Sequence, residues 1–271
     1  MDRRQFLRLT VLGGLSSIAG CSESTRPVEE LDSFATHNYH PVPAGECLIQ
    51  PISSSYTAEI EYYVNVRRPD EGYSQSVPAN ALVLPEYVVP GEGTRELPRE
   101  VLSGYLESPS RLDVLEDIDA SGTVPPGWNT FVVDNSRGET AIQVETGGTL
   151  YRSKDPVGAS SCDTTSEGKL SVQKLDFVRS YAGPPNRLLF HYRIDSPASD
   201  RYRWSVTVLT KTAQTTATWE TESECAAHLA GDWEIADDAL NGFRQSGDRL
   251  KVEITAIGES DEYRAEQWVD L

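Results

Sequence analysis

The sequence contains little lysine, methionine or cysteine, and it has no long apolar run. Only five of its 24 basic residues are lysine, and its 42 acidic residues give a formal net charge of −18. Phosphate backbones are bound by clustered basic residues, so this balance argues against a nucleic-acid partner. Methionine occurs only as Met1, and no stretch reaches the ~20 apolar residues that a membrane-spanning helix needs.

The motifs of common enzymes are also missing. The chain contains no G-x-S-x-G, no H-E-x-x-H and no glycine-rich phosphate loop. The adjacent pair Asp237 and Asp238 would face opposite sides of a strand, so it does not form a carboxylate dyad by itself. We therefore expect no catalytic residues and no cofactor.

The chain begins with a leader typical of exported lipoproteins. Arg3 and Arg4 precede the short apolar run Leu9–Ala19, which leads into Gly20-Cys21. Paired arginines in this position are the twin-arginine form of export signal, and the ending resembles a lipobox, whose cysteine is acylated and becomes the first mature residue. An amphipathic helix, the alternative, lacks a charged face opposite the apolar one. The resemblance implies a signal peptide over residues 1–20 and a lipid on Cys21 that holds the protein at the extracellular face of the cytoplasmic membrane.

The acidic residues are spread along the whole chain. Removing the signal peptide takes away one acid and three arginines, so the remaining 41 acids and 21 bases give −20. A dispersed acidic surface with few lysines resembles proteins of salt-loving archaea, in which charge maintains solubility at high ionic strength. A cation-binding protein is the rival interpretation.

The cysteine count limits the possible disulfides. With Cys21 assigned to lipid, Cys47, Cys162 and Cys225 remain, which allows at most one internal bridge and one spare thiol. We favour a bridge between Cys162 and Cys225, because both lie in the second half of the chain.

Composition and periodicity divide the mature chain into four parts. Residues 21–43 are acidic and lack periodicity, which predicts a disordered tether. Residues 44–153 predict a β-sandwich domain, residues 154–168 a linker, and residues 169–271 a second β-sandwich domain. The fold class is therefore all-β, with two antiparallel, Greek-key-like sandwiches.

Alternation of apolar and polar residues supports the β assignment. In Glu59–Arg67 apolar side chains occupy alternate positions, with Tyr63 the one apolar member of the polar face, as in an antiparallel strand over a core. Asn80–Val89 contains Pro85 and predicts an edge strand or a bulge, and Glu96–Leu106 predicts a short helix. In the second half, Tyr202–Leu209 and Arg249–Ile257 alternate, with these residues expected to point inward: Trp204, Val206, Val208, Leu250, Val252, Ile254 and Ala256. Glu222–Leu229 is expected to form one or two helical turns.

The most distinctive internal stretch is Val124–Ser136. A Pro-Pro-Gly turn enters an aromatic-rich strand, and Asp134-Asn135-Ser136 turns the chain out again. This stretch resembles the late hairpin of the pre-peptidase C-terminal and GOLD-like β-sandwich accessory domains. The resemblance implies a carrier or binding module rather than a catalyst.

Two metal sites can be considered from the sequence. Cys225 and His228, together with the upstream His191, have spacing compatible with a copper site, but no methionine remains to serve as an axial ligand. His191 also lies in an outward register if Phe190, Tyr192 and Ile194 point inward. We therefore interpret Cys225 as a disulfide partner and His228 as a surface residue.

A calcium loop is the second possibility. Asp117 and Asp119 match the start of a helix-loop-helix calcium loop, but Trp128 stands where the bidentate glutamate belongs. An acidic turn is the simpler interpretation. His37 and His40, in the expected tether, lack the further ligands of a metal site.

These observations predict a lipid-anchored extracellular protein with a binding or structural role. Its partners would be the membrane, through the lipid, and an unidentified protein or small-molecule ligand. The alternatives are a secreted calcium- or copper-binding protein and an accessory protein of a cell-surface hydrolase.

Overall fold

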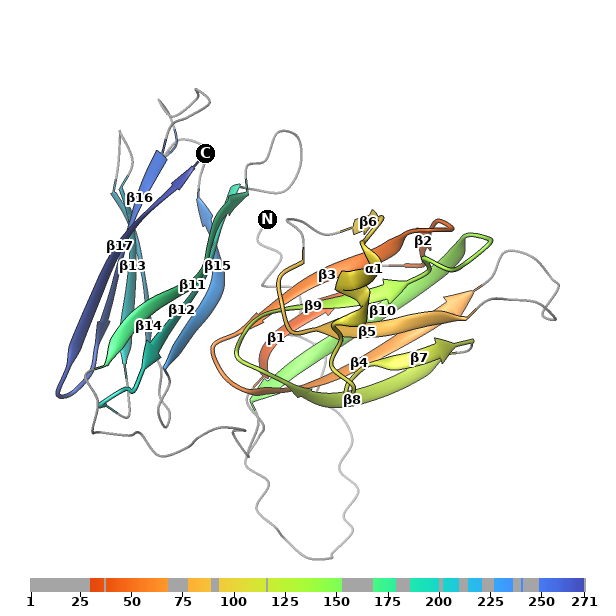
Figure 1. Cartoon of the computed structure of the whole chain (residues 1–271), viewed down its shortest axis with the longest axis horizontal. Helices are drawn as coiled ribbons and strands as arrows, with labels where there is room; N and C mark the ends of the chain where they lie inside the picture. Colours follow the sequence, from red (N-terminus) through yellow and green to blue (C-terminus); the bar gives the residue numbers. More distant parts are fainter. Residues whose placement is uncertain are drawn as a thin grey trace, which may run out of the picture.

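The structure is a computed structural model, and it is almost entirely β (Figure 1). It describes these residues: 30–36, 38–67, 78–88, 93–115, 117–152, 168–178, 186–199, 202–209, 214–220, 227–235, 240 and 249–270. Within these ranges, no helix has the length and apolar character needed to span a membrane.

Two antiparallel sheets make up the first half of the chain. The first sheet has the order β1 (Glu30–Ala35), β10 (Ile142–Arg152), β4 (Ala58–Arg67) and β8 (Ile118–Val124), and β2 (His40–Val42) also pairs with β10. The second has the order β6 (Gly93–Arg95), β3 (Cys47–Ser54), β9 (Gly127–Asp134), β5 (Ala79–Leu84) and β7 (Arg111–Val114). We call them sheet A and sheet B.

Sheets A and B face each other across one core. Ile60 and Val64 of β4 meet Phe131 and Val133 of β9 in a single buried cluster. Alternation in β4 places its apolar side chains, except that of Tyr63, in this core and its acidic ones outside, as the sequence predicts.

Sheet B is also covered on its other face. The helix α1 (Arg99–Ser103) and its flanking residues contribute Leu97 and Leu102 to a second cluster, where they pack on Ile49 and Val132. With both faces covered, every residue of β9 is buried, which explains the uninterrupted apolar run Phe131–Val133.

The second half is a sandwich of a three-stranded and a four-stranded sheet. Sheet C has the order β11 (Lys169–Val178), β12 (Asn186–Asp195) and β15 (His228–Ile235). Sheet D has the order β14 (Gln214–Glu220), β13 (Arg203–Leu209), β16 (Arg249–Ile257) and β17 (Glu262–Asp270). The seven residues predicted to point inward from β13 and β16 are all buried in the core between these sheets.

A hydrogen-bonded cluster of Ser199, Tyr202 and Asp261 connects two segments at one end of the second sandwich. The Tyr202 hydroxyl donates to Asp261 Oδ2 at 2.5 Å, and the Ser199 hydroxyl donates to Asp261 Oδ1. Burial opposes ionisation of Asp261, but the hydrogen bonds from Ser199 and Tyr202 outweigh it and lower its pKa. The cluster ties the segment before β13 to the turn between β16 and β17.

Two expectations about local structure are wrong. The predicted tether includes β1 and β2, because Leu31 and Phe34 pack against the first core and pairing with β10 satisfies the backbone. Of the segment Glu222–Leu229, expected to form one or two helical turns, residues 222–226 lie outside the described residues, and β15 begins at His228. The Asp-Asn turn does not close a hairpin, because β9 belongs to sheet B and β10 to sheet A.

Asn135 accounts for that crossing between sheets. Its side-chain nitrogen donates to the carbonyl oxygens of Val42 at 3.1 Å, Pro43 at 3.0 Å and Thr140 at 3.1 Å. These bonds hold the chain as it leaves β9 and crosses to the opposite sheet. Pro85 lies just after β5, a strand that pairs with both β9 and β7 and has an irregularity between Ala79 and Ala81.

Candidate functional site: a histidine pair beside the contact between the halves

The outer face of sheet C brings His191 and His228 together. In the pairing of β12 with β15, His191 lies opposite Ala230 and Arg193 lies opposite His228. The two histidines are therefore diagonal neighbours on one face, and side chains in this relation reach each other when they are long or aromatic.

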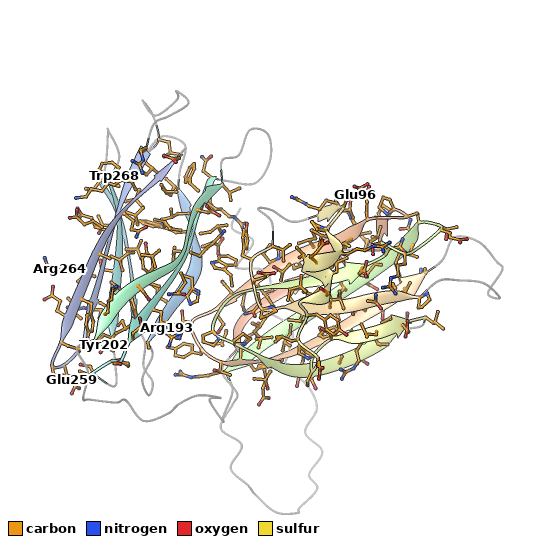
Figure 2. All side chains as sticks on the ribbon, in the orientation of Figure 1. Glu96, Arg193, Tyr202, Glu259, Arg264 and Trp268 are labelled. Carbon is orange, nitrogen blue, oxygen red and sulfur yellow. The ribbon has the colours of Figure 1, made fainter. Side chains whose placement is uncertain are left out.

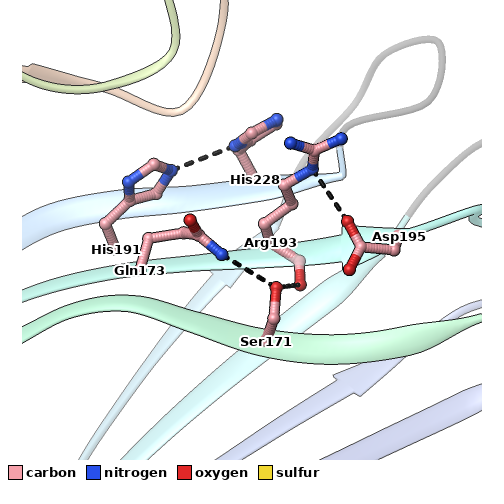
Figure 3. Close-up of polar contacts among 6 residues, drawn as sticks. All are labelled: Ser171, Gln173, His191, Arg193, Asp195 and His228. Atoms are coloured by element: carbon pink, nitrogen blue, oxygen red, sulfur yellow. Dashed lines mark hydrogen bonds and ion pairs between the residues drawn. The ribbon is translucent and has the colours of Figure 1, made fainter.

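The two imidazoles are in direct contact. Nε2 of His191 lies 3.0 Å from Nδ1 of His228, and the rings are stacked with centroids 5.3 Å apart (Figure 3). A hydrogen bond at this distance requires one nitrogen to carry a proton and the other to offer a lone pair. At least one ring of the pair is therefore neutral.

Partial burial favours the neutral form of both rings. Desolvation, with the positive charge of Arg193 as a smaller cause, lowers the pKa of His191 to about 4. Desolvation also lowers the pKa of His228 to about 4, with further contributions from His191 and Arg193. Both imidazoles are thus uncharged and able to act as ligands at neutral pH.

The two basic side chains beside the histidine pair each form an ion pair with an aspartate. Nε of Arg193 lies 3.0 Å from Oδ1 of Asp195 (Figure 3). Lys174, which lies opposite His191 in β11, forms an ion pair with Asp176. These carboxylates offset the two cations that would otherwise repel a positively charged ligand.

The histidine pair lies beside the contact between the two halves of the chain. A Cβ atom on Gly127, at the start of β9, would lie 2.6 Å from Cε1 of His191, so the ring packs against the glycine backbone. The next residue, Trp128, donates from Nε1 to the Phe190 carbonyl oxygen at 3.0 Å. Ser55 Oγ accepts from the Ala230 amide at 3.1 Å. His191 is therefore held by residues from both halves.

A second candidate is a hollow of about 560 Å³ on the outer face of sheet A. Tyr63 lines it, with its ring against the backbone of Gly147, where a Cβ would lie 2.8 Å from the ring. Asp119 is the cross-strand neighbour of Tyr63, and Ser121 is that of Glu61. The lining residues are Glu61, Tyr62, Tyr63, Arg111, Asp119, Ala120, Ser121, Gly147, Gly148 and Thr149.

The structure separates the roles of the two calcium candidates. Asp117 Oδ1 accepts a hydrogen bond from the Val66 amide at 3.1 Å, just beyond the point where pairing of β4 with β8 ends. Asp119 lines the hollow on sheet A. In the described part of the chain, no three or more His, Cys, Asp or Glu side chains are grouped so that they could hold a metal ion.

Most other residues predicted to have a role lie outside the described residues. These are Arg3, Arg4, Cys21, His37, Cys162, Cys225, Asp237 and Asp238. Cys47 is described, and it is a buried free thiol. Burial, with the nearby Asp134 as a further cause, raises its pKa, so the thiol stays protonated and poorly nucleophilic.

Sequence reasoning placed His191 outward but missed its contact with His228. The signal available was the partial alternation in His228–Ile235, where Leu229 and Ile235 are buried and Asp232 and Glu234 are exposed. That pattern predicts a strand, but it does not say which strand is its neighbour, and the contact depends on the register with β12.

Comparison with known proteins does not identify a family. No protein-family model and no curated protein matches the chain. Among solved structures, a GH2 β-galacturonidase from Eisenbergiella tayi bound to galacturonate is 9% identical, with a TM-score of 0.27, and the match covers 91% of this chain and 44% of that one. Red sea bream transglutaminase is 10% identical, with a TM-score of 0.24, and the match covers 91% of this chain and 32% of that one. The chain thus spans less than half the length of these proteins, and similarities this low carry no argument about its activity.

Proposed function

We propose that the protein is a non-catalytic, lipid-anchored surface protein that binds a ligand outside the cytoplasmic membrane. The observation that carries the proposal is the order Arg3-Arg4, short apolar run, Cys21, placed ahead of a body made almost entirely of antiparallel strands. Twin-arginine leaders address proteins for export, and the lipobox resemblance assigns the anchor to Cys21.

The short segment between Cys21 and β1 limits how far β1 can lie from the membrane. Glu30 opens β1 only nine residues after Cys21. Nine residues reach at most about 30 Å when fully extended. A lipid on Cys21 would therefore keep sheet A, in which β1 pairs with β10, close to the bilayer.

The hollow on sheet A is the binding surface that we favour. The Tyr63 ring provides an apolar surface, while Glu61 and Asp119 provide hydrogen-bond acceptors and Ser121 and Thr149 provide hydroxyl groups. Aromatic rings pack on apolar ligand faces, and carboxylates accept hydrogen bonds from hydroxyl groups. With the two carboxylates of Glu61 and Asp119 against the one guanidinium of Arg111, this combination suits a neutral, hydroxyl-rich small molecule better than an anion.

The anchor is tested by fractionating cells that express the full-length protein or its Cys21→Ser variant. We expect the unaltered protein in the membrane fraction, released only by detergent, and the variant in the soluble fraction. A variant that stays with the membrane, or an unaltered protein that retains Met1, would contradict the assignment.

The binding role is tested separately with the detergent-purified protein in high salt. Calorimetric titration with soluble oligosaccharides should give a signal that Tyr63→Ala removes. Tyr105→Ala, at a tyrosine packed near α1 on the far side of sheet B, is the matched control. Robust turnover of glycosidase or esterase substrates would contradict the non-catalytic assignment.

A further inference from the structure

The histidine pair has the geometry of two metal ligands. Ligand nitrogens lie about 2.0–2.1 Å from a bound zinc ion, so two of them are about 2.9 Å apart at a right angle and about 3.4 Å apart at the tetrahedral angle. The observed separation of Nε2 of His191 and Nδ1 of His228 is 3.0 Å, which lies between these values. Rotation of the rings about their side-chain torsions is the movement needed to direct both lone pairs at one ion.

The chemistry of the surroundings agrees with a cation. Both imidazoles are half-buried, so they keep an open side toward solvent. Depression of both pKa values to about 4 means that protons do not compete for the nitrogens at neutral pH. The nearest basic side chains, Arg193 and Lys174, are each paired with a carboxylate.

The ligand type selects the class of metal. Imidazole nitrogen binds zinc, copper, nickel and iron, whereas calcium and magnesium prefer oxygen. Affinity among the divalent first-row ions is greatest for copper. Within the described ranges no group of three His, Cys, Asp or Glu side chains includes the pair, so these ranges supply two ligands to the site.

We propose that His191 and His228 form a two-histidine binding site for a late first-row divalent metal ion, with copper(II) bound most tightly. The site lies where the ring of His191 rests on Gly127, so the bound ion would link strands β12 and β15 beside the contact between the halves. This proposal is independent of the hollow on sheet A, because the two sites share no residue.

The test is titration of the chelator-stripped, full-length protein in detergent with copper(II) chloride. Electron paramagnetic resonance should show one ion per chain, with hyperfine coupling to two imidazole nitrogens. His191→Gln and His228→Gln should each weaken binding by at least about tenfold, by analogy with the loss of groups that support a metal site. His40→Gln, at an exposed histidine on β2, is the matched control and should leave binding unchanged.

Several outcomes would overturn the proposal. These are coupling to fewer than two nitrogens, unchanged affinity in both site variants, or equal loss in the His40 variant. A sulfur-to-copper charge-transfer band in place of the two-nitrogen signal would place the ion on a cysteine and also overturn it. The nitrogen count is measured on the unaltered protein, so the test still decides if a glutamine variant fails to fold.

Discussion

The two halves of the chain differ in how many faces of their sheets are covered. Sheet B of the first half has sheet A on one face and the α1 segment on the other, so its central strand β9 is buried throughout. In the second half, sheets C and D share one core, the outer face of sheet C meets the first half only near Gly127 and Ser55, and β13 and β16 alternate between buried and partly or fully exposed residues. Both candidate sites lie on outer faces, of sheet A and sheet C. In this fold, both candidate sites therefore lie on sheets whose outer face is at least partly open.

The largest expected effect contrasts the core of the second half with its outer surface. Trp204 is fully buried between sheets C and D, whereas Trp268 is 54% exposed on β17, at a position labelled in Figure 2. Trp204→Ala should lower the free energy of unfolding by about 3–5 kcal/mol, because it removes a large buried side chain and leaves a cavity. Trp268→Ala should change it by less than about 0.5 kcal/mol. Urea unfolding followed by circular dichroism measures both, and equal effects would mean that Trp204 is not a core residue.

The next prediction tests the second covered face of sheet B. Val132 is fully buried under the α1 segment, and Thr123 is exposed on β8 of sheet A. Val132→Asn should cost about 3 kcal/mol or more, because it buries an amide without partners and loses apolar burial. Thr123→Asn should cost no more than about 0.5 kcal/mol. If Val132→Asn were equally mild in urea unfolding, the α1 segment would not cover that face in solution.

The same contrast explains which parts of the fold could be predicted from the sequence. The sequences of β13 and β16 alternate between apolar and polar residues because one face of each strand is exposed to solvent. The inward direction of Trp204 and Leu250 therefore follows from period two alone. The outward direction of His191 follows in the same way and is confirmed, since Phe190, Tyr192 and Ile194 are buried. These are local properties of single strands.

Pairing between distant strands has no comparable local signal. The turn at Asn135 shows that the chain reverses but not that β10 joins the opposite sheet. The contact of His191 with His228 requires β12 and β15 to be neighbours in one particular register, although 37 residues separate the two histidines. The position of β1 in sheet A likewise depends on pairing with β10, which a polar segment does not reveal.

The third prediction concerns the pH dependence that the histidine pair introduces. The pKa of each ring is near 4 in the folded protein, against 6.5 for an unperturbed histidine. Between these values the unfolded chain binds more protons than the folded one, so stability is complete above pH 6.5 and falls as the pH drops toward 4. The loss between pH 6.5 and 5.5 should be on the order of 1 kcal/mol for each histidine.

Glutamine variants isolate this contribution. The double variant His191→Gln, His228→Gln should flatten the dependence of the unfolding free energy on pH between 6.5 and 4, while His40→Gln should leave it unchanged. Asp134 and Asp261 have lowered pKa values, so their contributions are lost only below the ordinary carboxyl range. An unchanged slope in the double variant would mean that the rings titrate normally and are not desolvated.

The smallest expected effect concerns the two aspartates on the open side of sheet A. Asp117 accepts from the Val66 amide at a strand end, so Asp117→Ala should cost about 0.5–1.5 kcal/mol. Asp119→Ala should cost less than about 0.5 kcal/mol, because this exposed side chain lines the hollow. Melting curves with and without calcium chloride complete the test. If calcium raised the melting temperature of the unaltered protein but not of either variant, the aspartates would be ion ligands. Asp117 would then serve to bind calcium rather than to accept the Val66 amide where the pairing of β4 with β8 ends.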